Sequence, residues 1–145
     1  MTRLVLIDTG PLVASINRGD RFHAWARERL GEMVPPLLTC EAVLAEACFL
    51  LASTSGGRAA VMGLVERGIL QVDFRVATQA TSLAALMAKY ADFPMSLADA
   101  CLVRMTELHE NSVLLTLDRD FMIYRRHGRR VLAVLIPPEL TTARR

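Results

Sequence analysis

Short, uniformly apolar runs recur along this chain, and segments with helical spacing separate them. These runs are RLVLID at 3–8, ILQVDF at 69–74, SVLLTL at 112–117 and RVLAVLI near the C-terminus, with a shorter one at about 37–39. Strands that are apolar at successive positions belong to sheets that are buried on both faces. Their alternation with helices predicts an α/β protein, with a central parallel sheet of about five strands covered by helices on both sides.

The segments between the runs carry helix signals. TGPLVAS follows the first strand and has Pro11 in its opening turn, where proline is tolerated. The expected ends of other helices are Asp20 and Gly31 for residues 19–32, Thr39 before EAVLAEACFLLA, Gly68 after RAAVMGLVER, and Ser96 before LADACLVRMTEL. A further helix is expected at 76–91, and a short helix or turn at 120–128.

Length and composition predict one domain. The chain has 145 residues, 52% of them hydrophobic, which is enough for a sizeable core. We expect a single domain at 1–140 and a flexible tail at 141–145. No apolar stretch reaches the roughly 20 residues of a membrane span, and no signal peptide is recognised, so a cytoplasmic protein is expected. The net charge of +2 identifies no partner, and the three cysteines are interpreted as buried thiols.

One charged residue is out of place in the most apolar helix. Ten of the twelve residues of EAVLAEACFLLA, at 41–52, are apolar, and Glu46 lies in their middle. Glu41 differs from it, because the helix dipole favours an anion in the first turn. An ionised carboxylate in apolar surroundings is costly unless it is paired or coordinates a metal. Glu46 is therefore a candidate ligand.

Four acids are expected at one edge of the sheet. Asp8 and Asp118 directly follow apolar strands, while Glu46 and Asp99 lie in the N-terminal halves of helices that begin at the same edge. Carboxylates brought together in this way repel one another, and a divalent cation removes the repulsion. Ligation by oxygen alone points to Mg²⁺ or Mn²⁺ rather than to zinc, since none of the three histidines has metal-ligand spacing.

Each of these acids also has a structural interpretation. Asp8 could cap the helix that follows it, and Asp118 could be a turn residue. Ser96 and Asp99 form a Ser-x-x-Asp capping box, which does not exclude a second role for one carboxylate oxygen. Glu46 could pair with an arginine or occupy an exposed strip of its helix.

A basic segment follows Asp118. It could form a phosphate-binding rim for RNA, a surface that receives an acidic partner segment, or a solvated face without function. Its arginines are Arg119, Arg125, Arg126, Arg129 and Arg130. The chain has no G-x-S-x-G sequence, P-loop or G-x-G-x-x-G sequence, which speaks against serine-hydrolase and nucleotide-driven chemistry.

Five motifs in this order resemble the PIN-domain family, and closely the VapC-type toxins of type II toxin–antitoxin pairs. They are LIDTGPLVAS, GDRFHAWA, TCEAVLAEACFLL, MSLADACLVR and LLTLDRDF. The resemblance covers nearly the whole chain and implies a three-layer αβα fold with strand order 3-2-1-4-5. It also implies a metal-dependent ribonuclease site at the carboxyl edge of the sheet.

The resemblance implies roles for particular residues. The catalytic, metal-binding acids would be Asp8, Glu46, Asp99 and Asp118, supported by the hydroxyl residues Thr9, Ser96 and Thr116. Asp120 is an extra acid whose role the sequence leaves open. Gly10 stands where family members often have serine, which leaves the acids unaffected.

The function predicted in this way is hydrolysis of RNA by metal-activated water, with Mg²⁺ or Mn²⁺ as the cofactor. The alternative is a non-catalytic or housekeeping PIN-domain protein that binds or processes RNA. A DNA nuclease of the flap-endonuclease group is disfavoured, because the chain is too short for the added elements of those enzymes. The resemblance also implies a cognate antitoxin and a homodimer, to which the apolar helices around 60–66 and 76–90 could contribute surface.

Overall fold

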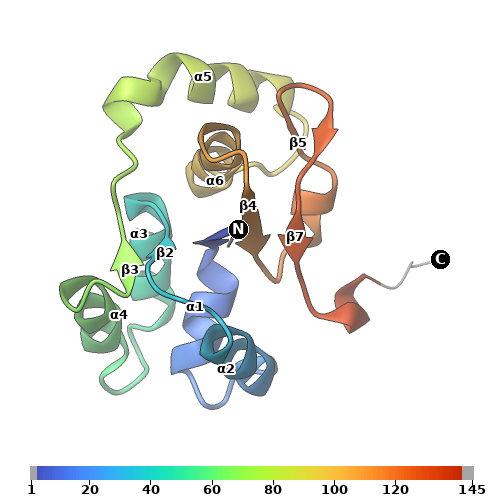
Figure 1. Ribbon diagram of the computed structural model, residues 1–145. Helices are drawn as coiled ribbons and strands as arrows, with labels where there is room; N and C mark the ends of the chain where they lie inside the picture. Colours follow the sequence, from blue (N-terminus) through green and yellow to red (C-terminus); the bar gives the residue numbers. More distant parts are fainter. Residues whose placement is uncertain (1–2, 142–145) are drawn as a thin grey trace.

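The computed structural model describes residues 3–141 and has a five-stranded parallel sheet at its centre (Figure 1). The strand order is β3-β2-β1-β4-β7, which confirms the predicted order 3-2-1-4-5 because β7 is the fifth strand of this sheet. The strands are β1 Leu4–Ile7, β2 Leu37–Leu38, β3 Leu70–Gln71, β4 Ser112–Leu115 and β7 Val134–Leu135.

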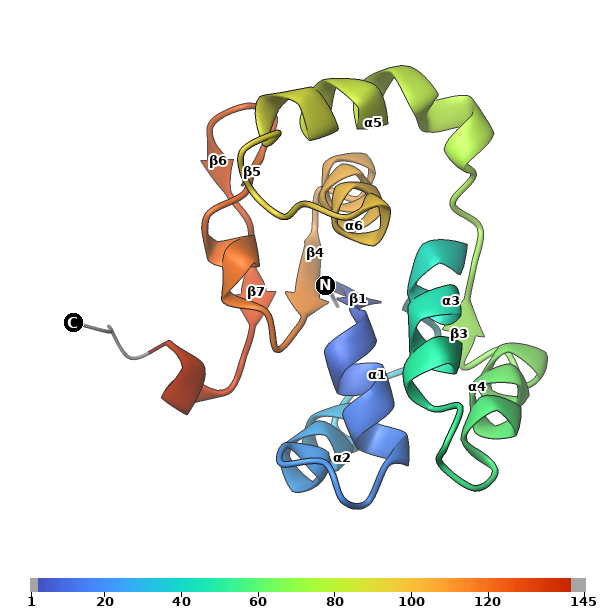
Figure 2. The ribbon, with the colours of Figure 1, turned by 180° about the vertical axis from the view of Figure 1, so that it is seen from behind.

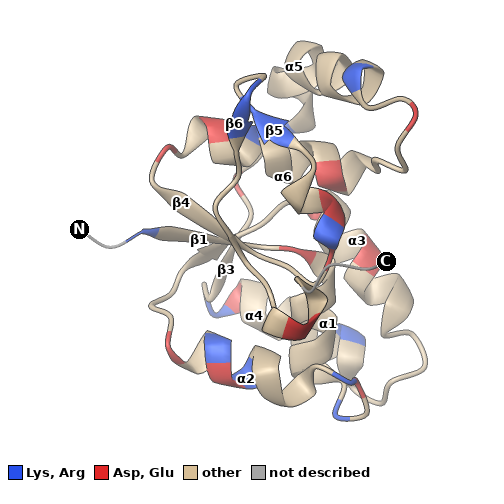
Figure 3. Cartoon of the chain, turned by 90° about the vertical axis from the view of Figure 1, so that its right-hand side faces the viewer, with Lys and Arg blue, Asp and Glu red and all other residues tan. Residues whose placement is uncertain are grey.

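Helices cover both faces of the sheet. Figure 3 shows α5 and α6 on one side of it and α2 and α4 on the other, and Figures 1 and 2 show α5 lying across α6. The helices are α1 Thr9–Ile16, α2 His23–Gly31, α3 Glu41–Leu50, α4 Gly57–Glu66, α5 Val76–Lys89 and α6 Leu97–Leu108. None of these described helices has both the length and the apolar character needed to cross a membrane.

The central strands are buried as their composition predicts. Leu6 and Ile7 of β1 are at most 1% exposed, although their side chains point to opposite faces of the sheet. Leu114 and Leu115 of β4 are likewise fully buried, and Leu115 lies opposite Ile7 in the parallel register. Helices on both faces account for this burial, which is why the runs are apolar throughout and not alternately.

The predicted helix caps are partly correct. Ser96 caps α6, and its reciprocal capping box with Asp99 is complete. Gly68 follows α4 with a φ of +74°, as a glycine at a helix end commonly does. Thr39 was the wrong cap for α3: the helix begins after Cys40, and the buried Thr39 hydroxyl instead donates 2.9 Å to the carbonyl of Ile7.

Asp20 is also not the residue that caps a helix. Its carboxylate accepts the N–H of Phe22 at 2.9 Å and so closes a turn just before α2, which begins at His23. The helix does end at Gly31, as the sequence predicts. Asp20 therefore stabilises the turn before α2 and not the first turn of the helix itself.

The C-terminal region differs most from the sequence prediction. Residues 120–128 are more than a short helix or turn: a 3₁₀ helix at Arg119–Met122 leads into β5, Arg125–Arg126, which pairs antiparallel with β6, Arg130–Val131. The last apolar run is divided between β6 and β7, because its first residues pair in this hairpin. His127 and Gly128 have positive φ values of 49° and 82° and make the hairpin turn. The predicted tail lies outside the described residues apart from Thr141.

Candidate active site

A cavity of about 650 Å³ opens at the carboxyl edge of the sheet. Asp8, Glu46, Asp99 and Asp118 all line it, although they come from four separate segments of the chain. The structure therefore brings the four predicted acids together around one space, as expected for residues at the ends of parallel strands and the starts of the following helices.

Asp8 ends β1 and is the most enclosed of the four acids, with only 6% of its surface exposed. One carboxylate oxygen accepts the Thr9 N–H at 2.7 Å, as a helix cap does, and the other accepts the Thr116 hydroxyl, also at 2.7 Å. Burial raises the pKa of Asp8 to about 7, and the negative charges of Asp99 and Asp118 act in the same direction. Asp8 therefore caps the helix as predicted, but burial makes its ionised form unfavourable.

Thr116 connects the acids of two neighbouring strands. It is fully buried after β4, donates its hydroxyl proton to Asp8, and accepts the backbone N–H of Asp118 at 2.9 Å on the same oxygen. Asp118 in turn accepts the Asp120 N–H at 2.9 Å, so it also closes a turn. The turn fixes Asp118 through one oxygen only.

Glu46 lies half-buried near the middle of α3. One of its oxygens accepts the Thr9 hydroxyl at 2.7 Å, which ties α3 to the start of α1. No ion pair of Glu46 is found within residues 3–141, so the proposed pairing with an arginine does not account for it there. The acids that the sequence places beside it, Asp8, Asp99 and Asp118, line the same cavity.

Asp99 stands in the first turn of α6 and takes part in the capping box. Its backbone N–H donates 3.0 Å to the Ser96 hydroxyl, and its Oδ2 accepts the Ser96 N–H at 3.3 Å. The hydroxyl of Tyr124 donates to the same Oδ2 at 3.2 Å. Burial, followed by the charge of Asp118, raises the pKa of Asp99, while the bonds from Ser96 and Tyr124 oppose that rise.

Hydrogen-bond donors hold the four acids, and no cation within residues 3–141 neutralises them through an ion pair. In the described part of the chain, three of the acids accept hydrogen bonds through only one of their two carboxylate oxygens: Glu46, Asp99 and Asp118. The second oxygen of each is available to another ligand.

Asp120 and Arg119 also line this cavity. Burial and the nearby charge of Asp118 raise the pKa of Asp120, and Arg119 counteracts them. Asp120 thus belongs to the same electrostatic group as the other acids. Gly10 allows close packing here, because a Cβ at this position would lie 3.1 Å from the Cβ of Leu117.

The predicted basic rim is dispersed. Of the five arginines, Arg119 lines the acidic cavity, whereas Arg125 turns onto the carbonyls of Met122, Ile123 and Tyr124. Figure 3 shows the hairpin strands β5 and β6 as a basic segment beside α6. There Arg126 bonds to the Thr106 carbonyl and to Glu110, and Arg129 and Arg130 are exposed.

Sequence reasoning missed two features of the site. Tyr124 is fully buried and reaches Asp99, and Leu50 and Pro94 give the cavity an apolar border. A tyrosine in an otherwise basic and apolar segment is a weak signal, since a buried phenol usually finds a polar partner. The identity of that partner cannot be read from neighbouring residues.

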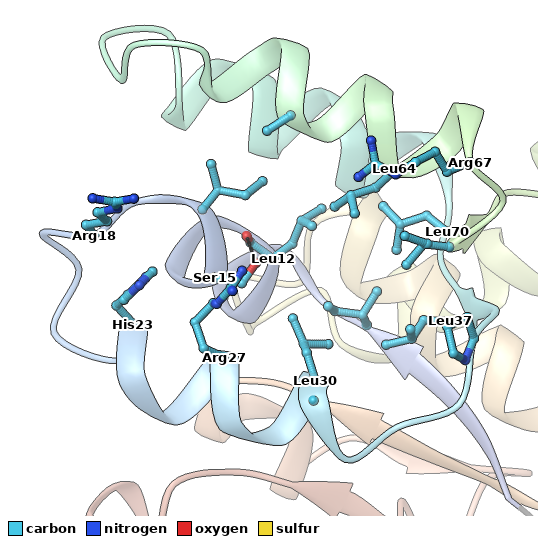
Figure 4. A pocket seen from close by; sticks show the side chains of 16 residues that line it. Leu12, Ser15, Arg18, His23, Arg27, Leu30, Leu37, Leu64, Arg67 and Leu70 are labelled. Carbon is cyan, nitrogen blue, oxygen red and sulfur yellow. Dashed lines mark hydrogen bonds between the residues drawn. The ribbon is translucent and has the colours of Figure 1, made fainter.

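A second cavity, of about 790 Å³, lies between α1, α2 and α4 (Figure 4). Figure 4 shows leucines from these helices, among them Leu12 and Leu64, pointing into the space. Arg18 lies toward one end and Arg67 toward the other, and Arg27 lies between them. The described lining residues include no aspartate or glutamate, so this cavity combines leucine side chains with a cationic border.

The fold and the cavity indicate the class of this protein, and comparison with known proteins identifies its family. The sheet order and the acids at its carboxyl edge define a nuclease fold of PIN type. Residues 5–126 match the model of the PIN domain, and this chain belongs to the PIN-domain family. A comparison with the curated proteins found no match.

Solved structures share the fold, among them one from Mycobacterium tuberculosis and one from Klebsiella pneumoniae. VapC20 of Mycobacterium tuberculosis, described as a Sarcin-Ricin loop cleaving toxin, matches with a TM-score of 0.68 and 23% identity over 80% of this chain and 91% of that chain. A toxin–antitoxin complex from Klebsiella pneumoniae contains a chain that matches with a TM-score of 0.59 and 20% identity, over 79% of this chain and 87% of that chain.

PIN domains typically bind metal, and the oxygen donors around the first cavity suit a hard divalent cation. Within residues 3–141, no group of three or more acidic, histidine or cysteine side chains is already arranged closely enough to hold a metal ion. The fit therefore rests on the chemistry of the donors: a buried acid with a raised pKa and three acids that each keep an oxygen available.

Proposed function

We propose that this protein is an Mg²⁺- or Mn²⁺-dependent endoribonuclease that acts as a VapC-like toxin of a type II toxin–antitoxin pair. The observation that carries the proposal is the convergence of Asp8, Glu46, Asp99 and Asp118 on one cavity, without an ion-pair partner among the described residues. Membership of the PIN-domain family and the fold shared with a Sarcin-Ricin loop cleaving toxin support it.

In this proposal the four acids would hold the cation. A bound divalent cation lowers the pKa of a coordinated water and neutralises charge that develops on the phosphate and the leaving oxygen. Thr116 and the Thr9 N–H orient Asp8, and the Thr9 hydroxyl orients Glu46. Asp8 would bind the cation as a carboxylate, so cation binding would compete with the proton that burial favours on this acid.

For the RNA backbone, we propose contacts from Arg119 beside the acids and from the exposed Arg129 and Arg130 on the hairpin. Arg125 and Arg126 bond mainly to the protein itself, so we assign them chiefly to the hairpin's structure. Their contribution to RNA binding would be indirect.

We propose an antitoxin as a partner and the second cavity as its docking surface. An apolar floor between Arg18, Arg27 and Arg67 fits an amphipathic segment with acidic flanks. Leu64 lies in the predicted apolar segment 60–66 and contributes to this floor, whereas Leu83 and Leu86 of the segment 76–90 are buried in the core. The related fold in a toxin–antitoxin complex supports an antitoxin as the partner.

A homodimer is also proposed, and the exposed apolar end of α3 supports it. Phe49 is 81% exposed and its neighbour Leu50 is 56% exposed. Contiguous apolar side chains of this size at a surface are characteristic of protein interfaces. Analytical ultracentrifugation of wild type and of Phe49→Glu tests this: we expect a dimer that the substitution dissociates, and a monomeric wild type would contradict it.

Cleavage of structured RNA tests the catalytic proposal. Purified wild type and Asp8→Asn are incubated with RNA in Mg²⁺, in Mn²⁺ and in EDTA. We expect cutting by wild type with either metal, no cutting in EDTA, and none by the variant. RNA binding without cutting under every metal condition would instead favour the non-catalytic alternative.

A further inference from the structure

Tyr124 is a fully buried side chain whose hydroxyl reaches the acidic site. Its Oη donates a hydrogen bond of 3.2 Å to Oδ2 of Asp99, 25 residues away in the sequence. A phenol has one hydroxyl proton to donate and an ionised carboxylate has none, so Tyr124 is the donor in this contact.

The ring of Tyr124 is held by contacts that do not involve Asp99. It packs edge-to-face on Tyr90, with ring centroids 5.0 Å apart, and on Phe121, with centroids 5.4 Å apart. The backbone N–H of Tyr124 donates 3.0 Å to the Asp120 carbonyl, in the turn that follows Asp118. The hydroxyl therefore occupies a position that the surrounding protein has already fixed.

The bond selects one of the two oxygens of Asp99. Oδ2 accepts from Tyr124 and from the Ser96 N–H, whereas no hydrogen bond to Oδ1 is found within residues 3–141. The carboxylate of Asp99 also lines the cavity that Asp8 and Asp118 share. A carboxylate anchored through one oxygen presents the other in a defined direction, as residues behind metal ligands commonly arrange.

We propose that Tyr124 is a positioning residue that anchors Oδ2 of Asp99 and so presents its other oxygen to the divalent cation. This inference rests on the proposed function, because it assumes a cation at the acidic cavity. It assigns Tyr124 a role that the aromatic packing alone does not require, since phenylalanine would fill the same space.

The test is the affinity of the RNA-free protein for Mn²⁺, measured by isothermal titration calorimetry. Tyr124→Phe keeps the ring and removes the hydroxyl, and we expect it to weaken Mn²⁺ binding by about 10- to 100-fold. Tyr90→Phe is the matched control, because its hydroxyl belongs to the same aromatic cluster but accepts the Arg125 N–H rather than touching an acid. The control should bind Mn²⁺ as wild type does.

A double-mutant cycle separates positioning from packing. In an Asp99→Asn background, Tyr124→Phe should cause no further loss of Mn²⁺ affinity, because the group that it positions is no longer a carboxylate. Equal losses in both backgrounds, an affinity unchanged by Tyr124→Phe, an equal loss in Tyr90→Phe, or failure of Tyr124→Phe to fold would each overturn the proposal.

The outcome also distinguishes this inference from the function on which it rests. A wild-type protein that binds no Mn²⁺ and cuts no RNA would remove both. A wild-type protein that binds Mn²⁺ and cuts RNA, with Tyr124→Phe equal to it in affinity, would remove only the role of Tyr124.

Discussion

The hydroxyl of Thr116 donates a 2.7 Å hydrogen bond to Oδ2 of Asp8, across the adjacent strands β1 and β4. Both residues are buried, and the same Thr116 oxygen accepts the N–H of Asp118. One threonine thus fixes a buried acid and the backbone of a second acid. This contact fixes the positions of the two strand-end acids, Asp8 and Asp118, relative to each other.

Replacing Thr116 with valine should weaken both the fold and the site. The change keeps the approximate shape but leaves the Asp8 carboxylate and the Asp118 N–H without their shared partner, which should cost about 1–3 kcal/mol of unfolding free energy. Mn²⁺ affinity should fall as well. Urea unfolding and calorimetry measure the two effects.

Thr106→Val is the matched control for that experiment. The Thr106 hydroxyl is also buried, but it donates to the carbonyl of Val103 within α6 and touches no acid. It should leave Mn²⁺ affinity unchanged. A loss of Mn²⁺ affinity equal to that of Thr116→Val would contradict a specific role for the Thr116–Asp8 contact.

The metal-free protein should lose stability as the pH rises from about 4 to about 7. Burial raises the pKa of Asp8 from 3.8 to about 7, so in this range the folded state retains a proton that the unfolded chain has released. Stability therefore falls with rising pH, by on the order of 4 kcal/mol if Asp8 acts alone. Urea unfolding in EDTA at a series of pH values measures this.

Asp8→Asn should abolish most of this pH dependence, because asparagine does not titrate. Added Mn²⁺ should raise the stability of wild type at pH 7 and above and leave that of the variant unchanged. An identical fall of stability with pH in both proteins would show that Asp8 is not its source.

The sheet was predictable because its signal is local and repeated. Strands such as β1 and β4 are apolar at successive positions, and the acids Asp8 and Asp118 follow them directly. Chain order then places the helix acids Glu46 and Asp99 at the same edge. These relations require only the sequence and the geometry of parallel strands.

The remaining features depend on contacts between distant segments. Thr39 is a residue type that commonly caps helices, but its hydroxyl donates to the carbonyl of Ile7, 32 residues away. Arg126 resembles a free surface cation in the sequence, but in the fold it bonds to the Thr106 carbonyl of α6 and to Glu110, which follows that helix. Tyr124 finds Asp99 in the same way. Local sequence patterns do not predict which of several possible partners a polar side chain will bind in the fold.

Glu46→Gln should separate metal binding from folding. Glutamine keeps the shape and an oxygen that can accept the Thr9 hydroxyl, but it removes a negative charge from the acidic cavity. Mn²⁺ affinity and RNA cleavage should fall by more than about 10-fold, while the metal-free melting temperature stays equal or rises because carboxylate repulsion is relieved.

Glu41→Gln is the control for Glu46→Gln. Glu41 is exposed in the first turn of the same helix and does not line the acidic cavity. It should retain wild-type Mn²⁺ affinity and cleavage. If Glu46→Gln unfolds the metal-free protein, Glu46 is a structural residue and its assignment as a ligand is wrong.

Charge reversal should separate the second cavity from the acidic one. Arg27 and Arg67 border the second cavity, between α1, α2 and α4, and neither lines the acidic cavity. The double variant Arg27→Glu/Arg67→Glu should weaken binding of an acidic antitoxin by roughly 30-fold or more, which corresponds to about 2 kcal/mol. Metal-dependent RNA cleavage should persist.

A short reading frame that overlaps or adjoins the gene would encode the antitoxin for this experiment. Its binding is measured by surface plasmon resonance. Arg129→Glu/Arg130→Glu is the control, because it makes the same change of charge on the exposed hairpin strand β6 and the turn before it. It should retain antitoxin binding and lose RNA affinity. Equal weakening of antitoxin binding by both double variants would indicate a general effect of charge and would contradict docking at the second cavity.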